Sequence, residues 1–167
     1  WLYPSETALE PDRYVVYNTS GNHWVFGTSF YGSFEDRTIF DNTLATGATP
    51  VSSSSYIWDN EPISVFTGNG LAIPSYLESA DFDIEQGSNI MFVDKLIPDL
   101  DINQGAINFS LHTRMYPDGL ATDKGPYPIN GSTQKVDLRA RGRQMHVRVS
   151  TSHLGTYWRW GSLRLAI

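Results

Sequence analysis

The sequence predicts an all-β protein in two parts, with propeller-like strands over residues 1–70 and a β-sandwich-like domain over residues 71–167. Short runs of alternating apolar and polar residues recur about every ten residues, separated by turn-forming residues, as in sheets joined by tight turns. The composition agrees, with 13% aromatic and 18% charged residues, 14 glycines and 9 prolines. No long segment shows the roughly 3.6-residue apolar repeat of a helix.

The first part contains short strand patterns. Residues 13–18 and 22–27 alternate on either side of the turn TSGN, which predicts a hairpin. The tract of small residues over 45–55 predicts a loop. Three more strands are predicted, over residues 36–42, 55–60 and 62–68. Strands at this spacing are typical of a sandwich or of propeller blades.

The pattern changes near Gly70. Residues 118–133 predict a long loop rich in turns, and Pro98 predicts a break or an edge in the strand that contains it. The predicted strands are 75–85, 89–102, 105–117, 135–150 and 155–167. Within 105–117, alternation places four side chains toward the core, those of Ile107, Phe109, Leu111 and Thr113.

The stretch KVDLRARGRQMHVRVS, residues 135–150, alternates in two phases. Apolar side chains fall on even positions up to Ala140 and on odd positions from Met145 onward. A phase change of this kind predicts one extra residue, a β-bulge, at Gly142. The outer face of the strand would then carry four basic side chains, Arg139 and Arg141 before the bulge and His146 and Arg148 after it.

The charge is unevenly distributed. Residues 1–100 hold 14 acidic and 3 basic side chains, a net charge of −11, and residues 101–167 hold 4 acidic and 9 basic ones, a net charge of +5. We therefore expect the arginines of RARGR to bond carboxylates or backbone carbonyls of a neighbouring strand or subunit. The residues concerned are Arg139, Arg141 and Arg143 with Asp81, Asp83 or Asp94. The alternative is that the arginines form a nucleic-acid-binding patch and contact DNA phosphates.

No pattern of catalytic or metal-binding residues stands out. The chain has 4 histidines without ligand-like spacing and no cysteine, and the acids of DFDIE are explained by strand alternation. A pair of carboxylates for glycoside hydrolysis needs only proximity in space, which the sequence does not reveal. We expect no enzyme activity, no metal and no cofactor. No apolar run approaches the roughly 20 residues of a membrane helix.

The tryptophans allow two interpretations. Side chains of Trp24, Trp58, Trp158 and Trp160 could stack on sugars, or could fill the core or a subunit interface, where aromatic residues are enriched. We favour the core or interface, and we expect Trp158 and Trp160 to be among the contacts between strands or subunits.

Five segments of the C-terminal part resemble a known family in order and spacing. They are YLESADFDIEQGSNIMFVDKLIPDLD, INFSLHTRMYPDG, KGPYPI, VDLRARGRQMHVRVS and GTYWRWGSLRL. Over about residues 75–165 the chain is similar to the end of the tail hub or nozzle proteins of short-tailed bacteriophages. DRYVVYN and DRTIFD resemble, more weakly, the last propeller blade of that family.

This resemblance implies a structural protein of the virion tail. Members form a ring, expected to be a homohexamer, around the genome-exit channel below the portal and adaptor, and DNA passes through it transiently. Partners would be other tail proteins, such as the adaptor and a fibre or spike, and no membrane segment is expected. The earlier blades and the platform of the family are absent, so we expect a piece of a longer subunit. The alternative is a carbohydrate-binding β-module, a receptor-binding part of a tail.

Overall fold

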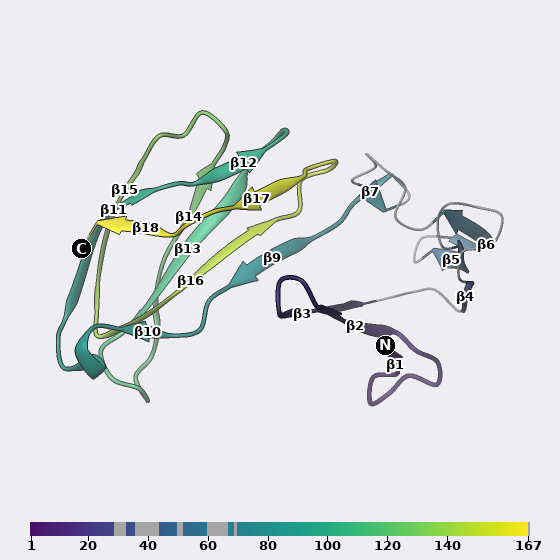
Figure 1. The fold of residues 1–167 in the computed structure, drawn as a ribbon, viewed down its shortest axis with the longest axis horizontal. Helices are drawn as coiled ribbons and strands as arrows, with labels where there is room; N and C mark the ends of the chain where they lie inside the picture. Colours follow the sequence, from purple (N-terminus) through teal and green to yellow (C-terminus); the bar gives the residue numbers. More distant parts are fainter. Residues whose placement is uncertain (29–32, 36–43, 50–51, 60–66, 69, 167) are drawn as a thin grey trace. The chain divides into compact units, whose positions relative to one another are not determined.

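The computed structural model describes residues 1–28, 33–35, 44–49, 52–59, 67–68 and 70–166. These residues form antiparallel strands, and the one helical element among them is a 3-10 turn, η1 (Glu85–Gly87). The all-β class is thereby confirmed. The chain divides into two compact units, Trp1–Val65 and Phe66–Ile167 (Figure 1). Within the described ranges, no helix has the length and apolar character needed to cross a membrane.

The predicted hairpin forms in unit 1. Strands β1 (Leu2–Tyr3), β2 (Arg13–Asn18) and β3 (His23–Thr28) make a three-stranded sheet in that order. The β2–β3 turn is closed by the Asn18 side chain, whose Oδ1 accepts a hydrogen bond from the Gly21 N–H at 2.8 Å. Asn22 adopts a left-handed backbone with φ of 49°, a conformation that asparagine tolerates well.

A second sheet of unit 1 corrects one prediction. Strands β4 (Ser33–Glu35), β5 (Leu44–Thr49) and β6 (Ser52–Asp59) pair in that order, so the loop predicted over 45–55 is wrong for residues 45–49 and 52–55. Pairing between β5 and β6 overrides the weak strand preference of small residues, because strand propensity depends strongly on context. The predicted strand 36–42 lies outside the described residues. Of 62–68, only β7 (Thr67–Gly68) is described, paired with β8 (Leu71–Ala72).

Unit 2 contains two larger sheets. The first has the order β10 (Phe82–Asp83), β16 (Gln144–Thr151), β13 (Ile107–Arg114) and β14 (Thr122–Ile129), and β9 (Ser75–Glu78) also pairs with β16. Figure 1 shows β13 and β16 side by side. The four inward positions predicted on β13 are all buried.

The second sheet has the order β15 (Val136–Gly142), β11 (Met91–Ile97) and β18 (Arg164–Ala166). The chain continues from β11 into β12 (Leu100–Ile102), which pairs with β17 (Trp158–Trp160). Pro98 and Asp99 separate β11 from β12, so the break predicted at Pro98 is confirmed. The Asp99 carbonyl accepts a hydrogen bond from the Gly161 N–H at 2.7 Å, which ties this bend to the C-terminal segment.

One apolar core lies between strands of both sheets. Phe109 of β13 and Leu96 of β11 are completely buried. Removing one such apolar side chain from water stabilises the folded state by about 1.5–3 kcal/mol. The other core residues are Met91, Val93, Ile107, Leu111, Ile129, Leu138, Ala140, Met145, Val147 and Val149. This core fixes which side chains of β13, β15 and β16 point outward, and hence the composition of the outer faces.

Strand β14 corrects a second prediction, because residues 122–129 form a strand inside the predicted loop 118–133. It is an edge strand, a position that tolerates Pro126 and Pro128 although neither has a backbone N–H. The register shifts between Phe109 and Leu111, so β14 carries an extra residue there. The prolines that indicated a loop are therefore accommodated at a sheet edge.

The phase change predicted at Gly142 is confirmed, but its cause is not a bulge. Residues up to Gly142 belong to one sheet and residues from Gln144 onward to the other, with Arg143 at the bend. Alternation restarts because the chain crosses between sheets, and the Arg143 N–H donates to the Arg114 carbonyl at 2.8 Å. The bulge of this segment lies within β15, where the register shifts opposite Val93 and Lys95.

Candidate functional site

A cluster of charged side chains covers the outer face of the first sheet of unit 2. We call it the histidine cluster, and it consists of Glu78, Asp81, His112, Arg114, Asp123, His146 and Arg148. At its centre the rings of His112 and His146 stack with centroids 4.3 Å apart and planes 20° apart. These histidines are direct cross-strand partners on β13 and β16, so the sheet register itself brings them together.

Each histidine is bonded to a carboxylate. His146 Nδ1 lies 2.9 Å from Asp81 Oδ1, and His112 Nδ1 lies 2.5 Å from Asp123 Oδ1. His146 Nε2 also lies 3.8 Å from Glu78 Oε1. These contacts favour the tautomer that carries its proton on Nδ1, because a carboxylate oxygen can only accept a hydrogen bond.

Two arginines complete the cluster on either side of the histidine pair. Arg148 donates to Glu78 Oε2 at 2.8 Å, and its guanidinium lies 4.5 Å from the centre of the Tyr76 ring. Arg114 donates to Asp81 Oδ2 at 3.4 Å. Glu78 and Asp81 each contact one arginine and His146, so these acidic and basic side chains form a continuous network.

The histidine cluster is suited to holding strands together. In the ranges that the structure describes, no group of three or more histidine, aspartate or glutamate side chains is arranged to hold a metal ion. Since the acids of the cluster already contact basic groups, the arrangement stabilises the face that β9, β13, β14 and β16 share. It cross-links strands distant in sequence, because Glu78 and Arg148 lie 70 positions apart.

Sequence reasoning missed this cluster, although a signal was present. The triplets His112-Thr113-Arg114 and His146-Val147-Arg148 repeat the pattern His-x-Arg on two strands. In each strand the middle residue is buried, so both histidines and both arginines must lie on the outer face. What the sequence did not reveal was that β13 and β16 are antiparallel neighbours with His112 directly opposite His146.

The structure separates the predicted arginine contacts. Arg139 and Arg141 project from β15 and are exposed, and across the described part of the chain neither has a hydrogen bond or an ion pair. The guanidinium of Arg143 lies 5.8 Å from the centre of the Tyr116 ring, and its buried Nε has no hydrogen-bond partner. Within one chain, therefore, these arginines do not bond the predicted acids.

The predicted acids have other surroundings. Asp81 belongs to the histidine cluster, and Asp83 lies exposed on β10 opposite Gln144 of β16. Asp94 is exposed on β11, where it faces the bulge in β15. Contacts of these arginines and acids with a second subunit remain a prediction.

Trp158 and Trp160 pack at the edge of the core. The indole N–H of Trp158 donates to Ser75 Oγ at 2.9 Å, and the Trp160 ring stacks on Phe109 with centroids 6.2 Å apart. Contacts between strands are thus present at both positions, and both side chains are partly buried. The side chain of Trp58 lies outside the described part of the structure.

The β1–β2–β3 sheet of unit 1 exposes apolar side chains on both faces. Trp24 and Phe26 are two positions apart on β3, so they lie on one face, and they are 59% and 65% exposed. On the same face the rings of Trp1 and Tyr17 lie 5.7 Å and 4.6 Å from that of Trp24. Val16 and Val25 are cross-strand partners on the opposite face, and both are exposed. A sheet with this composition is suited to being covered on both sides.

One carboxyl group has a shifted pKa. Asp12 accepts hydrogen bonds from the hydroxyl and the backbone N–H of Ser5, both at 2.6 Å. These bonds, the hydroxyl one first, hold the pKa of Asp12 below its ordinary value of 3.8, because they favour the charged carboxylate. The pair closes the loop between β1 and β2.

Comparison of the chain with models of known protein families and with curated proteins finds no match in either set.

Proposed function

We propose that the chain is a structural subunit of a short-tailed bacteriophage tail, a hub or nozzle protein without enzyme activity. In this proposal several copies form a ring, a homohexamer, around the channel through which the genome leaves. The proposal rests on the resemblance of residues 75–165 to that family, and on surfaces suited to contacts between subunits.

The observation that carries the proposal is the apolar surface on both faces of the β1–β2–β3 sheet. Monomeric proteins rarely expose contiguous apolar patches larger than a few hundred Å², and such patches mark interaction surfaces. Propeller blades are sheets stacked face to face, so each blade is covered on both sides by its neighbours. Strands β1 to β3 accordingly belong to a propeller-like blade whose two faces are covered in the assembled particle.

Unit 2 supports the second half of the predicted architecture. The sheets led by β16–β13 and by β15–β11 place their apolar side chains in one core, as the two sheets of a sandwich do. In the proposal this sandwich-like unit is the rigid body of the subunit. The histidine cluster stiffens its outer face, because it links strands β9, β13, β14 and β16 through side-chain hydrogen bonds and ion pairs.

Arg141 fits a contact between subunits. It is exposed on a strand that lies at the edge of its sheet, and it has no partner among the described residues of its own chain. Residues 1–65 carry 8 acidic and 2 basic side chains, so a neighbouring copy offers carboxylates in excess. Bidentate pairing of guanidinium with carboxylate would then fix the orientation of the two copies.

The decisive experiment is native mass spectrometry of the purified chain, across protein concentrations from about 1 to 100 μM. The proposal expects a closed ring with about six times the 18.7 kDa mass of one chain. A matched variant, Trp24→Ser with Phe26→Ser, should shift the population toward monomer while the far-ultraviolet circular dichroism of the strands is kept. A chain that stays monomeric throughout the concentration range contradicts the proposal.

A further inference from the structure

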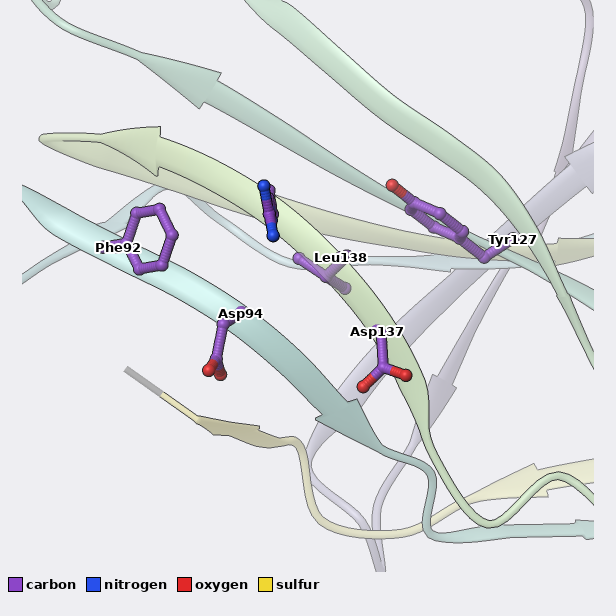
Figure 2. Close-up of a pocket in the computed structure, with 6 residues that line it drawn as sticks. Phe92, Asp94, Tyr127, Asp137 and Leu138 are labelled. Carbon is purple, nitrogen blue, oxygen red and sulfur yellow. The ribbon is translucent and has the colours of Figure 1, made fainter.

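An open hollow of about 720 Å³ lies where β15 meets β14, beside β11. It falls in the range of about 300–1,000 Å³ that small-molecule sites occupy. Its lining combines three charged side chains, two aromatic rings and one aliphatic side chain, namely Asp94, Asp137, Arg139, Phe92, Tyr127 and Leu138. Figure 2 shows that Asp94 and Asp137 point to the same side of strands β11 and β15.

The bulge in β15 shapes this hollow. Between the pairs Val93–Ala140 and Lys95–Asp137, β11 has one residue, Asp94, whereas β15 has two, Leu138 and Arg139. The extra residue re-aims the side chains of the bulged strand, a use of bulges that recurs beside binding sites. As a result the Asp94 carboxylate and the Arg139 guanidinium stand on neighbouring strands without an ion pair between them.

Polar groups of the hollow keep their hydrogen-bonding capacity. Over the ranges that the structure describes, Asp94, Arg139 and the Tyr127 hydroxyl make no hydrogen bond, while Asp137 contacts only Lys135, at 3.2 Å. A carboxylate offers acceptors and a guanidinium offers five donors in a fixed plane. The hollow can therefore both donate to and accept from one bound molecule.

Its aromatic rings supply flat apolar surface. Phe92 is 52% exposed, and Tyr127 is half-buried against the core with its hydroxyl directed toward β15 (Figure 2). Tyr127 belongs to the other sheet, so the two rings approach the hollow from different sides. Such rings pack against the apolar C–H face of a ligand while the charged groups bond its polar edge.

The charges select the ligand class. A cation would meet Arg139, and an anion would meet the carboxylates of Asp94 and Asp137. A neutral molecule with several hydroxyl groups satisfies both kinds of side chain, because each hydroxyl donates and accepts. We propose that this hollow binds a neutral pyranose sugar, with the ring packed on Phe92 and hydroxyl groups bonded to Asp94 and Arg139. This site does not depend on the proposed ring, and it is separate from Trp158 and Trp160.

The test is saturation-transfer NMR of the 167-residue chain with methyl β-glucopyranoside, methyl β-galactopyranoside and N-acetylglucosamine, followed by titration calorimetry of any sugar that responds. At least one of the three should bind with a dissociation constant in the millimolar range or tighter. Phe92→Ala should weaken that binding about tenfold or more, since it removes the packing surface. Asp94→Asn should weaken it as well, because the amide is a poorer acceptor than the carboxylate.

Ile97→Ala is the matched control, because Ile97 is a 43% exposed apolar residue on the same strand that does not line the hollow. It should bind the sugar as the unaltered chain does, and all variants should show comparable melting temperatures. Absence of transfer to all three sugars overturns the proposal, as does binding that Phe92→Ala leaves unchanged. Stronger binding of Nα-acetyl-lysine amide, whose ε-ammonium group is charged, than of any sugar would overturn it too, because the hollow would then be a cation site. Each of these results is independent of the mass of the assembly.

Discussion

The imidazole rings of His112 and His146 stack across β13 and β16, and each is bonded to a different carboxylate, Asp123 and Asp81. The acidic side chains of Glu78, Asp81 and Asp123 flank the stacked pair. The pairing links β13 and β16 through side chains as well as through the backbone ladder.

Removing Asp81 should destabilise unit 2. Asp81→Ala deletes the acceptor of both His146 and Arg114, and we expect the free energy of unfolding to fall by about 0.5–1.5 kcal/mol. Chemical denaturation monitored by tryptophan fluorescence measures this change. Asp101→Ala is the control, since Asp101 is exposed and has no side-chain bond among the described residues. Equal effects of the two substitutions would show that the histidine cluster does not stabilise the sheet.

Gly142→Ala should be costly at the crossing between sheets. An added Cβ would lie 3.0 Å from the Arg114 carbonyl oxygen and 3.1 Å from Thr113 Cβ, and backbone cannot give way easily. We expect a loss of about 1–3 kcal/mol, as for other overpacked sites. At Gly131 an added Cβ would make an ordinary contact of 3.5 Å with Ile102, so Gly131→Ala serves as control. A similar melting temperature for both variants would contradict the tight crossing.

Arg143→Met should change stability by less than about 0.5 kcal/mol. The Arg143 Nε is buried without a partner, so the substitution removes an unsatisfied donor while it keeps an apolar stem of similar length. Arg148→Met provides the comparison, because Arg148 bonds Glu78 and lies over Tyr76, and it should cost about 1 kcal/mol. Thermal unfolding of the two variants measures which substitution lowers the stability more. If Arg143→Met were the more damaging, the Arg143 guanidinium would have to be bonded in the folded protein.

The pKa of Asp12 gives a prediction for acid pH. Its folded-state pKa lies below the ordinary 3.8, so its carboxylate stabilises the folded chain above that value, and the contribution is lost as pH falls through the lowered pKa. Ser5→Ala should raise the pKa of Asp12 toward 3.8 and leave stability at neutral pH slightly lower. Carbon-detected NMR titration of the carboxyl group measures the pKa of Asp12 in the unaltered chain and in Ser5→Ala. An Asp12 that titrates identically in the two proteins would show that Ser5 does not cause the shift.

Arg141→Ala should leave the isolated chain almost unchanged and weaken the assembly. Within one chain Arg141 is exposed without a partner among the described residues, and substitutions of that kind usually stay within about 0.5 kcal/mol. If Arg141 bonds a carboxylate of a neighbouring copy, the melting temperature of the assembly falls while DNA binding is unaffected. Weaker DNA binding with a flatter salt dependence would instead place Arg141 against phosphates.

Strand alternation predicted most of unit 2 because its core is formed by regular two-residue repeats. Ile107, Phe109 and Leu111 follow this rule, and the structure buries all of them. The same rule located the change of phase at Gly142. It could not distinguish a bulge from a crossing between sheets, because both shift the apolar register by one position.

The failures have a common physical origin in strand pairing. Residues 45–49 are small and residues 122–129 include two prolines, which favours loops locally, yet pairing with β6 and with β13 holds them as strands. The histidine cluster was missed for the same reason. His112 and His146 meet only because β13 and β16 pair in one particular register, and a single sequence does not specify that register.

The prolines of β14 have a consequence for the behaviour of the molecule at high concentration. Edge strands with free N–H groups recruit strands from other molecules, which leads to fibrous aggregates. Pro126 and Pro128 leave two positions of this edge without a donor, so a foreign strand added there would lack part of its ladder. Strand β14 is therefore a poor template for a further strand. At high concentration this disfavours extension of the sheet from one copy of the chain to the next along that edge.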